Sequence, residues 1–215
     1  MNIFFFFTSL LIAFAITPLV IMIYQRMGWL DDPTKSAHPK VIHTRPIPRG
    51  GGVAVFCSLL LSTFLFVPYT PTVLGIFFGA TILMLVGFWD DLKDPPPLIR
   101  FALQVIAALT VVSFGIGISF VTNPFGGLVL FSDIPYASSL LAVIWIVWCM
   151  NIVNFSKGVD GQMPGYVVVA GIVITLLSLR FSGDPSQLLV TRLSIALAGT
   201  FAGFIFNLLE KGLLG

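Results

Sequence analysis

The chain has 215 residues, of which 57% are hydrophobic and 9% are charged, and its mean hydropathy is +1.03. Because a soluble domain carries about 25% charged residues, this composition excludes an ordinary soluble protein and predicts an integral membrane protein. The formal net charge is only +2, and we expect the membrane, and no nucleic acid, among the partners of this chain.

Apolar segments long enough to cross a bilayer recur along the whole sequence, since a span needs ~20 apolar residues. The first of them lacks the basic start and the cleavage pattern of a signal peptide, so we interpret it as a retained span. The predicted fold is all-α, a polytopic transmembrane bundle of about seven helices in a single transmembrane domain over residues 1–215. The expected helices are 3–24, 51–69, 73–89, 100–121, 137–155, 164–181 and 192–209, with the third and sixth near the short limit.

Basic residues alternate between the loops and thereby predict the orientation of the chain. Cytoplasmic loops carry an excess of Lys and Arg, and the second, fourth and sixth loops have none, although Arg180 and Arg192 flank the sixth. We therefore expect the N-terminus outside, the C-terminus and the odd loops in the cytoplasm, and a multi-pass protein of the plasma (inner) membrane. The basic residues of the odd loops and the C-terminus are Arg26, Lys35, Lys40, Arg45, Arg49, Lys93, Arg100, Lys157 and Lys211.

The first cytoplasmic loop combines both histidines with four prolines and the run Gly50–Gly52. Three glycines at a helix start let backbone N–H groups approach an anionic head group closely. The same glycines would equally permit close helix packing, and the sequence leaves both interpretations open. A zinc site at His38 and His43 is not expected, because no third ligand lies nearby.

The third loop begins with two adjacent carboxylates, Asp90 and Asp91, at the end of an apolar helix. A helix C-terminus already carries partial negative charge, so either a bound cation or a basic cluster is needed to offset them. Mg²⁺, which prefers oxygen ligands, fits the first option. One helix further on, Arg100 and Gln104 share a face at i, i+4, and Gln104 should face the bundle interior.

The fifth loop, "NIVNFSKGVDG", carries Asn151 and Asn154 on one helical face, followed by Lys157 and Asp160. A C-cap and turn would explain the glycines around Asp160, but it explains the paired asparagines poorly. Three polar clusters on one side of the membrane predict a single cytoplasmic-face site. Such a site suits a phosphorylated, metal-chelating substrate.

Three ordered motifs, "HTRPIPRGGGVAVF", "GFWDDL" with Arg100 and Gln104 downstream, and "NIVNFSKGVDG", resemble those of the polyprenyl-phosphate N-acetylhexosamine-1-phosphate transferases. This family, glycosyltransferase family 4, includes phospho-N-acetylmuramoyl-pentapeptide transferase and undecaprenyl-phosphate GlcNAc-1-phosphate transferase. The resemblance covers roughly residues 28–165.

The resemblance implies a membrane enzyme that moves a sugar-1-phosphate from a UDP-N-acetylhexosamine-type donor to polyprenyl (undecaprenyl) phosphate, with release of UMP. The products would be lipid intermediates of the cell wall or of surface glycans. The implied cofactor is Mg²⁺, with Mn²⁺ as the alternative, and it would neutralise the diphosphate. The implied partners are the polyprenyl phosphate lipid and the UDP-sugar, and a homodimer is one expected assembly.

The resemblance also implies roles for individual residues. Asp90, Asp91 and Asp160 take the catalytic positions, and Asp91 and Asp160 are the implied metal ligands. Asn154 and Asp160 would lie beside the nucleotide. The implied substrate-binding residues are His43, Arg45, Arg49, Arg100, Asn151, Asn154 and Lys157.

Two departures from the family pattern affect these expectations. Lys157 stands where the family has the first Asp of N-x-x-D-G-x-D-G. The family also continues through a G-D-x-G-S loop and a His-rich loop to about ten helices, whereas this sequence stops at Gly215. We therefore expect a truncated or divergent short form with little or no transferase activity of its own.

Two other functions stay open at this point. A catalytically silent membrane scaffold of the same family would also retain the first seven helices. An unrelated transporter should carry polar residues or broken helices near mid-membrane. Here the polar residues cluster at the cytoplasmic ends, which places the transporter last.

Overall fold

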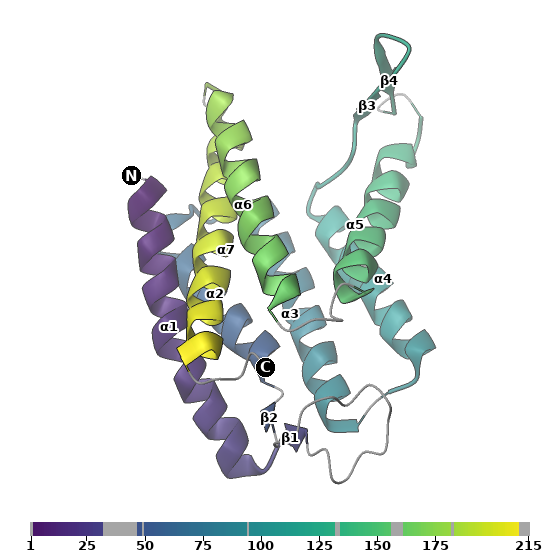
Figure 1. Ribbon diagram of the computed structural model, residues 1–215. Coiled ribbons are helices and arrows are strands. Elements are labelled where there is room, and N and C mark those ends of the chain that lie inside the picture. Colours follow the sequence, from purple (N-terminus) through teal and green to yellow (C-terminus); the bar gives the residue numbers. More distant parts are fainter. Residues whose placement is uncertain are drawn as a thin grey trace. The chain divides into compact units, whose positions relative to one another are not determined.

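The structure is a computed structural model that describes residues 2–31, 47–48, 50–93, 95–131, 134–155, 161–181 and 183–210 (Figure 1). It confirms the all-α prediction in these residues, which form seven helices and two short antiparallel strand pairs. The helices are α1 (Asn2–Met27), α2 (Gly51–Phe66), α3 (Pro71–Lys93), α4 (Pro97–Ser113), α5 (Ala137–Phe155), α6 (Gln162–Arg180) and α7 (Pro185–Glu210). The strands are β1 (Leu30–Asp31), β2 (Ile47–Pro48), β3 (Phe120–Thr122) and β4 (Leu128–Leu130).

Five of the seven described helices, α1, α3, α5, α6 and α7, are long and apolar enough to span a membrane. The sequence predicted third and sixth helices near the short limit of a span. Helix α6 has 19 residues, but α3 has 23, and the shortest described helices are α2 with 16 residues and α4 with 17. Helix α2 ends at Phe66 because Val67, which precedes Pro68, takes an extended backbone conformation.

Helix α4 ends eight residues before the predicted limit of residue 121. Gly115 adopts a positive φ of 93° directly after the helix, a conformation that favours glycine. The chain then forms the antiparallel pair β3–β4, in which Val121 lies opposite Val129. The turn sequence between the strands, "NPFGG", is typical of a hairpin connection, so the signal was present in a segment interpreted as helix and loop.

The chain divides into two compact units. The first comprises α1, β1, β2, α2, the end of α3 from Gly87 to Lys93, α6 and α7. The second comprises α3 up to Val86, α4, β3, β4 and α5. Whether residues 1–215 behave as one domain stays a prediction.

Helix α7 lies at the centre of the first unit, where it packs against α1, α2 and α6 (Figure 1). A side chain at Gly199 would meet the backbone carbonyl of Phe6, and one at Gly203 would meet the carbonyl of Leu10. Glycines spaced by four residues let two membrane helices approach closely. This spacing therefore determines how tightly α1 and α7 pair.

Hydroxyl groups connect α6 to α7 on the opposite side of α7. The Thr175 and Ser194 hydroxyls share a hydrogen bond of 2.8 Å, and the Ser178 and Thr191 hydroxyls share one of 2.7 Å. All four residues are buried. In an apolar medium such pairs contribute to helix association together with close packing.

Arg192 lies within α7, although the sequence placed it at the start of that helix. Its Nη1 donates to the carbonyl of Phe66, at the C-terminus of α2, over 3.3 Å. Its guanidinium carbon lies 5.9 Å from the centre of the Phe5 ring. The negative end of the α2 dipole and the aromatic face thus stabilise a cation inside the first unit.

The second unit is built around small residues in the same way. A side chain at Gly75 would lie 2.4–3.1 Å from Phe114 atoms, and one at Gly79 would meet Val111 and the Ala107 carbonyl. Helix α3 therefore lies close to α4, and α4 packs in turn against α5.

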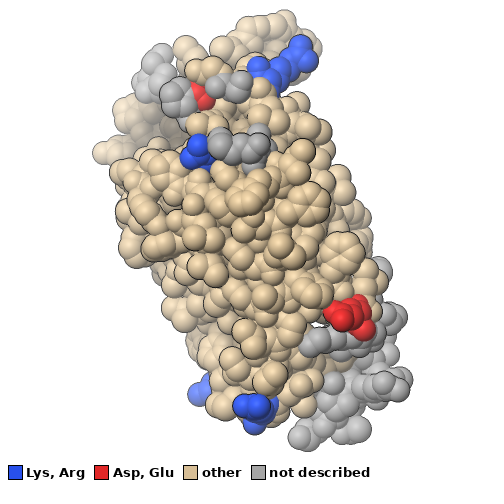
Figure 2. Space-filling model, turned by 90° about the vertical axis from the view of Figure 1, so that its left-hand side faces the viewer, with Lys and Arg blue, Asp and Glu red and all other residues tan. Residues whose placement is uncertain are grey.

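Figure 2 shows one face of the molecule, on which the described Lys, Arg, Asp and Glu side chains gather toward its upper and lower ends. The surface between them carries none of these residues in its described part. Many large apolar side chains are exposed, among them Leu11, Phe64 and Leu176. Such a surface is expected for helices that face lipid.

Candidate active site

An aromatic cluster in the first unit joins the end of α1 to the end of α3. The ring centroids of Tyr24 and Trp29 lie 5.2 Å apart, and Phe88 lies 6.5 Å from Tyr24 and 5.3 Å from Trp29. Helix α1 ends in a Schellman motif, with φ of 71° at Gly28 and a hydrogen bond from Trp29 N–H to the Tyr24 carbonyl. This turn directs the chain back and brings Trp29 against Tyr24.

Phe88 thereby fixes the position of the adjacent aspartates. Asp90 and Asp91 follow it in the last turn of α3, and both are half-buried. The structure confirms that the two carboxylates lie at the C-terminus of an apolar helix. Asp91 also interacts electrostatically with Tyr24. The pair is therefore held on a helix end that packs against α1, rather than on a solvated loop.

The three glycines at the start of α2 have different surroundings. A Cβ at Gly50 would lie 2.6 Å from the Tyr24 ring, and one at Gly51 would lie 3.0 Å from the Phe204 ring. A Cβ at Gly52 would meet nothing within 4 Å. Of the two interpretations that the sequence left open, close packing thus applies to Gly50 and Gly51, whereas Gly52 leaves the backbone open to approach.

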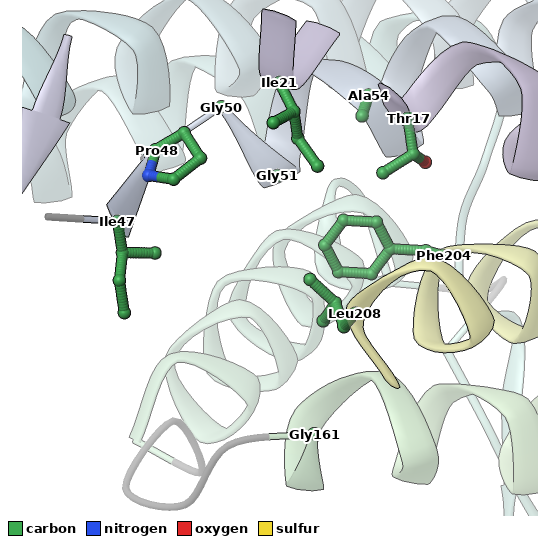
Figure 3. A pocket seen from close by; sticks show the side chains of 10 residues that line it. All are labelled: Thr17, Ile21, Ile47, Pro48, Gly50, Gly51, Ala54, Gly161, Phe204 and Leu208. Carbon is green, nitrogen blue, oxygen red and sulfur yellow. The ribbon is translucent and has the colours of Figure 1, made fainter. Parts of the chain in front are cut away.

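A cavity of about 190 Å³ lies beside these glycines in the first unit (Figure 3). Helix α1, strand β2 and the start of α2 form one side of it, and α7 and the start of α6 form the other. Its walls are mostly aliphatic or aromatic. The lining residues are Thr17, Ile21, Ile47, Pro48, Gly50, Gly51, Ala54, Gly161, Phe204 and Leu208.

The first turn of α2 and the turn before α6 both reach this cavity. Gly50 is the N-cap residue of α2, and no described side chain caps its N–H groups. Gly161 has a φ of 75°, which favours glycine, and its carbonyl accepts the N–H of Gly165. Gly161 therefore lines the same cavity as Ile47, Pro48, Gly50 and Gly51 of the first motif, while the one-site hypothesis stays a prediction.

The second unit contains a pair of amides on facing helices. The Asn151 Nδ2 on α5 donates to Gln104 Oε1 on α4 over 2.9 Å and to the Val147 carbonyl over 2.8 Å. Because that carbonyl only accepts, Asn151 must present its NH₂ group, and Gln104 must present its oxygen. Gln104 therefore faces another helix, as predicted, and its own NH₂ group points away from this bond.

The remaining predicted site residues divide between the second unit and the part of the chain outside the described residues. Arg100 is half-buried near the start of α4, and Asn154 is exposed in the last turn of α5. His43, Arg45, Arg49, Lys157 and Asp160 lie outside the described residues. Within the described ranges, no group of three or more His, Cys, Asp or Glu residues could hold a metal ion. The convergence of Asp90, Asp91, Asn154 and Asp160 stays a prediction.

Comparison with known proteins identifies the family of this chain. The family model for glycosyl transferase family 4 matches residues 73–210, which is more than half of the sequence. The chain belongs to glycosyl transferase family 4. Its matched region begins in α3 and includes the aspartate pair, the two amides and the "GVDG" motif.

Three relatives illustrate the range of this family. The chain is 30% identical to the probable undecaprenyl-phosphate N-acetylglucosaminyl 1-phosphate transferase of Bacillus subtilis, over 94% of this chain and 54% of the relative. It is 27% identical to the decaprenyl-phosphate N-acetylglucosaminephosphotransferase of Mycobacterium tuberculosis, over 92% and 51%. It is 25% identical to a phospho-N-acetylmuramoyl-pentapeptide-transferase of Wolbachia, over 94% and 64%.

The chain thus spans about half the length of the first curated relatives that it matches. The sequence did not predict that Tyr24 and Phe88 hold the end of α1 against the end of α3. Their signals were a glycine at the end of α1 and an aromatic residue just before the aspartates.

Proposed function

We propose that this site serves the transfer of a sugar-1-phosphate from a UDP-N-acetylhexosamine-type donor to a polyprenyl phosphate, with release of UMP. The observation that carries the proposal is the arrangement inside the first unit. There, Gly50 of the first motif contacts Tyr24, Tyr24 contacts Phe88 of the aspartate motif, and Gly161 of the third motif lines the same cavity as Gly50. Membership of glycosyl transferase family 4 supports the same reaction class.

The aspartate pair has the chemistry of a magnesium site. Mg²⁺ keeps several of its waters and binds proteins through one or two carboxylates together with substrate phosphates. Asp90 and Asp91 supply two carboxylates on adjacent positions, half-buried at a helix end. When bound, Mg²⁺ would neutralise charge on the diphosphate. Asp90 and Asp91 would hold the ion, with Asp160 as the further ligand that the sequence motif implies.

The cavity suits the lipid substrate better than the nucleotide. A nucleotide requires polar partners, whereas the walls here come mainly from Ile21, Ile47 and Leu208 and from the Phe204 ring (Figure 3). At its rim lie the N–H groups of the first turn of α2, which no described side chain caps, and they and the positive end of the helix dipole favour a phosphate. An isoprenoid unit in the cavity would place its phosphate at this helix start.

The proposed reaction also requires a defined orientation. The excess of basic residues in the odd loops supports a cytoplasmic position for the aspartates, with UDP-sugar arriving from the cytoplasm. A plasma-membrane location, Mg²⁺ rather than Mn²⁺, and a homodimer belong to the same proposal.

The test measures binding and turnover in parallel. The chain is purified in detergent, and UMP release is followed with UDP-N-acetylglucosamine, undecaprenyl phosphate and Mg²⁺. Binding of undecaprenyl phosphate is followed separately by ³¹P NMR. Asp90→Asn and Asp91→Asn are compared with Lys93→Gln, an exposed residue of the same helix end.

We expect little or no turnover by this chain alone. Any turnover that it does show should fall by about 100-fold or more in each aspartate variant, because a group positioned on transition-state charge is lost, and should stay nearly unchanged in Lys93→Gln. Binding that depends on Mg²⁺ and on both aspartates, without turnover, would assign the described site to substrate capture alone. Equal binding and equal turnover in all variants would overturn the proposal.

A further inference from the structure

The hairpin β3–β4 exposes an unusual amount of apolar surface. All six strand residues are exposed, and Phe125 in the turn is 97% accessible. Residues 114–131 contain no Lys, Arg, Asp or Glu. An isolated two-stranded hairpin is at best marginally stable in water. The surroundings of this hairpin must therefore contribute to its stability.

Both faces of the hairpin are apolar, which distinguishes it from a water-exposed hairpin. Residues opposite each other in an antiparallel pair lie on the same face. Phe120 and Leu130 are such a pair on one face, and Val121 and Val129 are such a pair on the other. A hairpin that docks one face on a protein would alternate apolar and polar residues. Two apolar faces fit a hairpin that contacts an apolar medium on both sides better than one that docks a single face on a protein.

The base of the hairpin is fixed to the first turn of α5. The Ile118 N–H donates to the Ser138 carbonyl over 3.3 Å, and the Phe131 N–H donates to the Ser119 carbonyl over 2.7 Å. In Figure 1 the hairpin projects beyond the end of α5. A helix of 19 residues is ~28 Å long, close to the ~30 Å of the hydrocarbon core. The start of α5 therefore lies at one membrane boundary.

The exposed face of α5 continues into the hairpin. Leu140 and Ile144 are exposed on this spanning helix, with accessible fractions of 62% and 53%. Tyr136, just before α5, is 87% accessible, and tyrosines are enriched where a bilayer meets water. The outer edges of β3 and β4 carry backbone groups that the hydrocarbon core would not satisfy. The interfacial layer of the bilayer provides both an apolar environment for the exposed side chains and polar partners for the backbone groups at the strand edges.

We propose that the β3–β4 hairpin is a membrane anchor that lies in the interfacial layer of the bilayer, with Phe125 at its tip inserted toward the acyl chains. The occupant of this apolar surface is lipid. Within the second unit, the anchor lies at the opposite end of α5 from Asn151.

Spin labels test this position in the full chain. Both cysteines of the sequence, Cys57 and Cys149, are replaced by serine, and a nitroxide is attached at Phe125→Cys. Gly183→Cys is the matched control, because Gly183 is exposed between α6 and α7 and has nothing within 4 Å of its Cβ position. In phosphatidylcholine–phosphatidylglycerol liposomes, collisions with O₂ report an apolar environment and collisions with a water-soluble nickel complex report water.

We expect the ratio of O₂ to nickel accessibility to be several-fold higher at 125 than at 183. Labels at Val121→Cys and Leu130→Cys, which lie on opposite faces, should both resemble the label at 125. An equal ratio at 125 and 183 would place the hairpin in water and overturn the proposal. Protection of the label at 125 from both reagents would indicate a protein contact, including a second copy of this chain, and would also overturn it.

Discussion

The side-chain amide of Asn207 on α7 donates to the backbone carbonyl of Phe14 on α1 over 3.1 Å. In a regular helix this carbonyl would accept the N–H of the residue four positions later, but that residue is Pro18, which has none. Asn207 is fully buried. It therefore satisfies an acceptor that proline leaves without a partner inside an apolar environment.

Replacement of Asn207 by leucine should destabilise the first unit. The loss leaves a buried carbonyl without a donor, which costs about 1–3 kcal/mol, and should lower the unfolding temperature measured by circular dichroism in detergent. Pro18→Ala restores the missing N–H. In the Pro18→Ala background, Asn207→Leu should therefore cost much less. An equal loss in both backgrounds would contradict this account of Asn207.

Gly50 and Gly52 provide a matched pair for the role of the glycine run. Gly50→Ala forces the Tyr24 ring to move and should lower the free energy of unfolding by about 1–3 kcal/mol, as overpacking does. Gly52→Ala should leave stability unchanged or raise it slightly, because its Cβ meets open space. Chemical denaturation of both variants in mixed micelles would check this difference, and similar losses at both positions would refute it.

The Asn151–Gln104 hydrogen bond should give a measurable coupling between α5 and α4. A double-mutant cycle with Asn151→Ala and Gln104→Ala should yield about 0.6 kcal/mol, and no more than ~1.7 kcal/mol, as found for hydrogen bonds between membrane helices. The same cycle with Asn154→Ala in place of Asn151→Ala is the control, since Asn154 is exposed on the same helix. Coupling of the same size in the control would argue against a specific bond.

Asp184, between α6 and α7, should make the stability of α7 depend on pH. The backbone N–H of Ser186 donates to its carboxylate over 2.8 Å and holds the pKa of Asp184 below its ordinary value. Because the folded-state pKa is the lower one, the stabilisation is complete above the unfolded value of about 3.9. It is lost as the pH falls through the folded-state pKa.

The pKa of Asp184 can be measured by ¹³C NMR of its carboxyl carbon. Asp184→Asn, which keeps an acceptor but does not titrate, should remove this part of the pH dependence of the unfolding temperature. An unchanged pH profile in that variant would show that Asp184 makes no such contribution.

The sequence predicted the seven helices because long apolar segments carry a strong and local signal. It did not predict the end of α4, where two glycines and a hairpin turn follow apolar residues that fit a helix equally well. The length of an apolar segment alone does not distinguish these conformations.

The candidate site was predictable only in part. Asp90, Asp91 and the glycine motifs stand out because charged residues and glycine runs are rare in this composition. Tyr24 and Phe88 are harder to predict, because the glycine at the end of α1 and the aromatic residues before the aspartates do not reveal which side chains Tyr24 and Phe88 contact. The role of Asn207 also depends on a residue almost the whole chain away, which only the tertiary structure identifies.

The close pairing of α1 with α7 has a consequence for biosynthesis. Phe14 and Asn207 are separated by 193 positions, and a ribosome adds ~5–20 residues per second. Roughly 10–40 s therefore pass between the synthesis of α1 and the synthesis of α7, the helix that carries Gly199 and Gly203. During this time the Phe14 carbonyl and the surface that receives Gly199 and Gly203 must be covered by lipid, by water or by the insertion machinery. A pause in translation before α7 would prolong this exposure, so the timing of synthesis becomes part of how the first unit assembles.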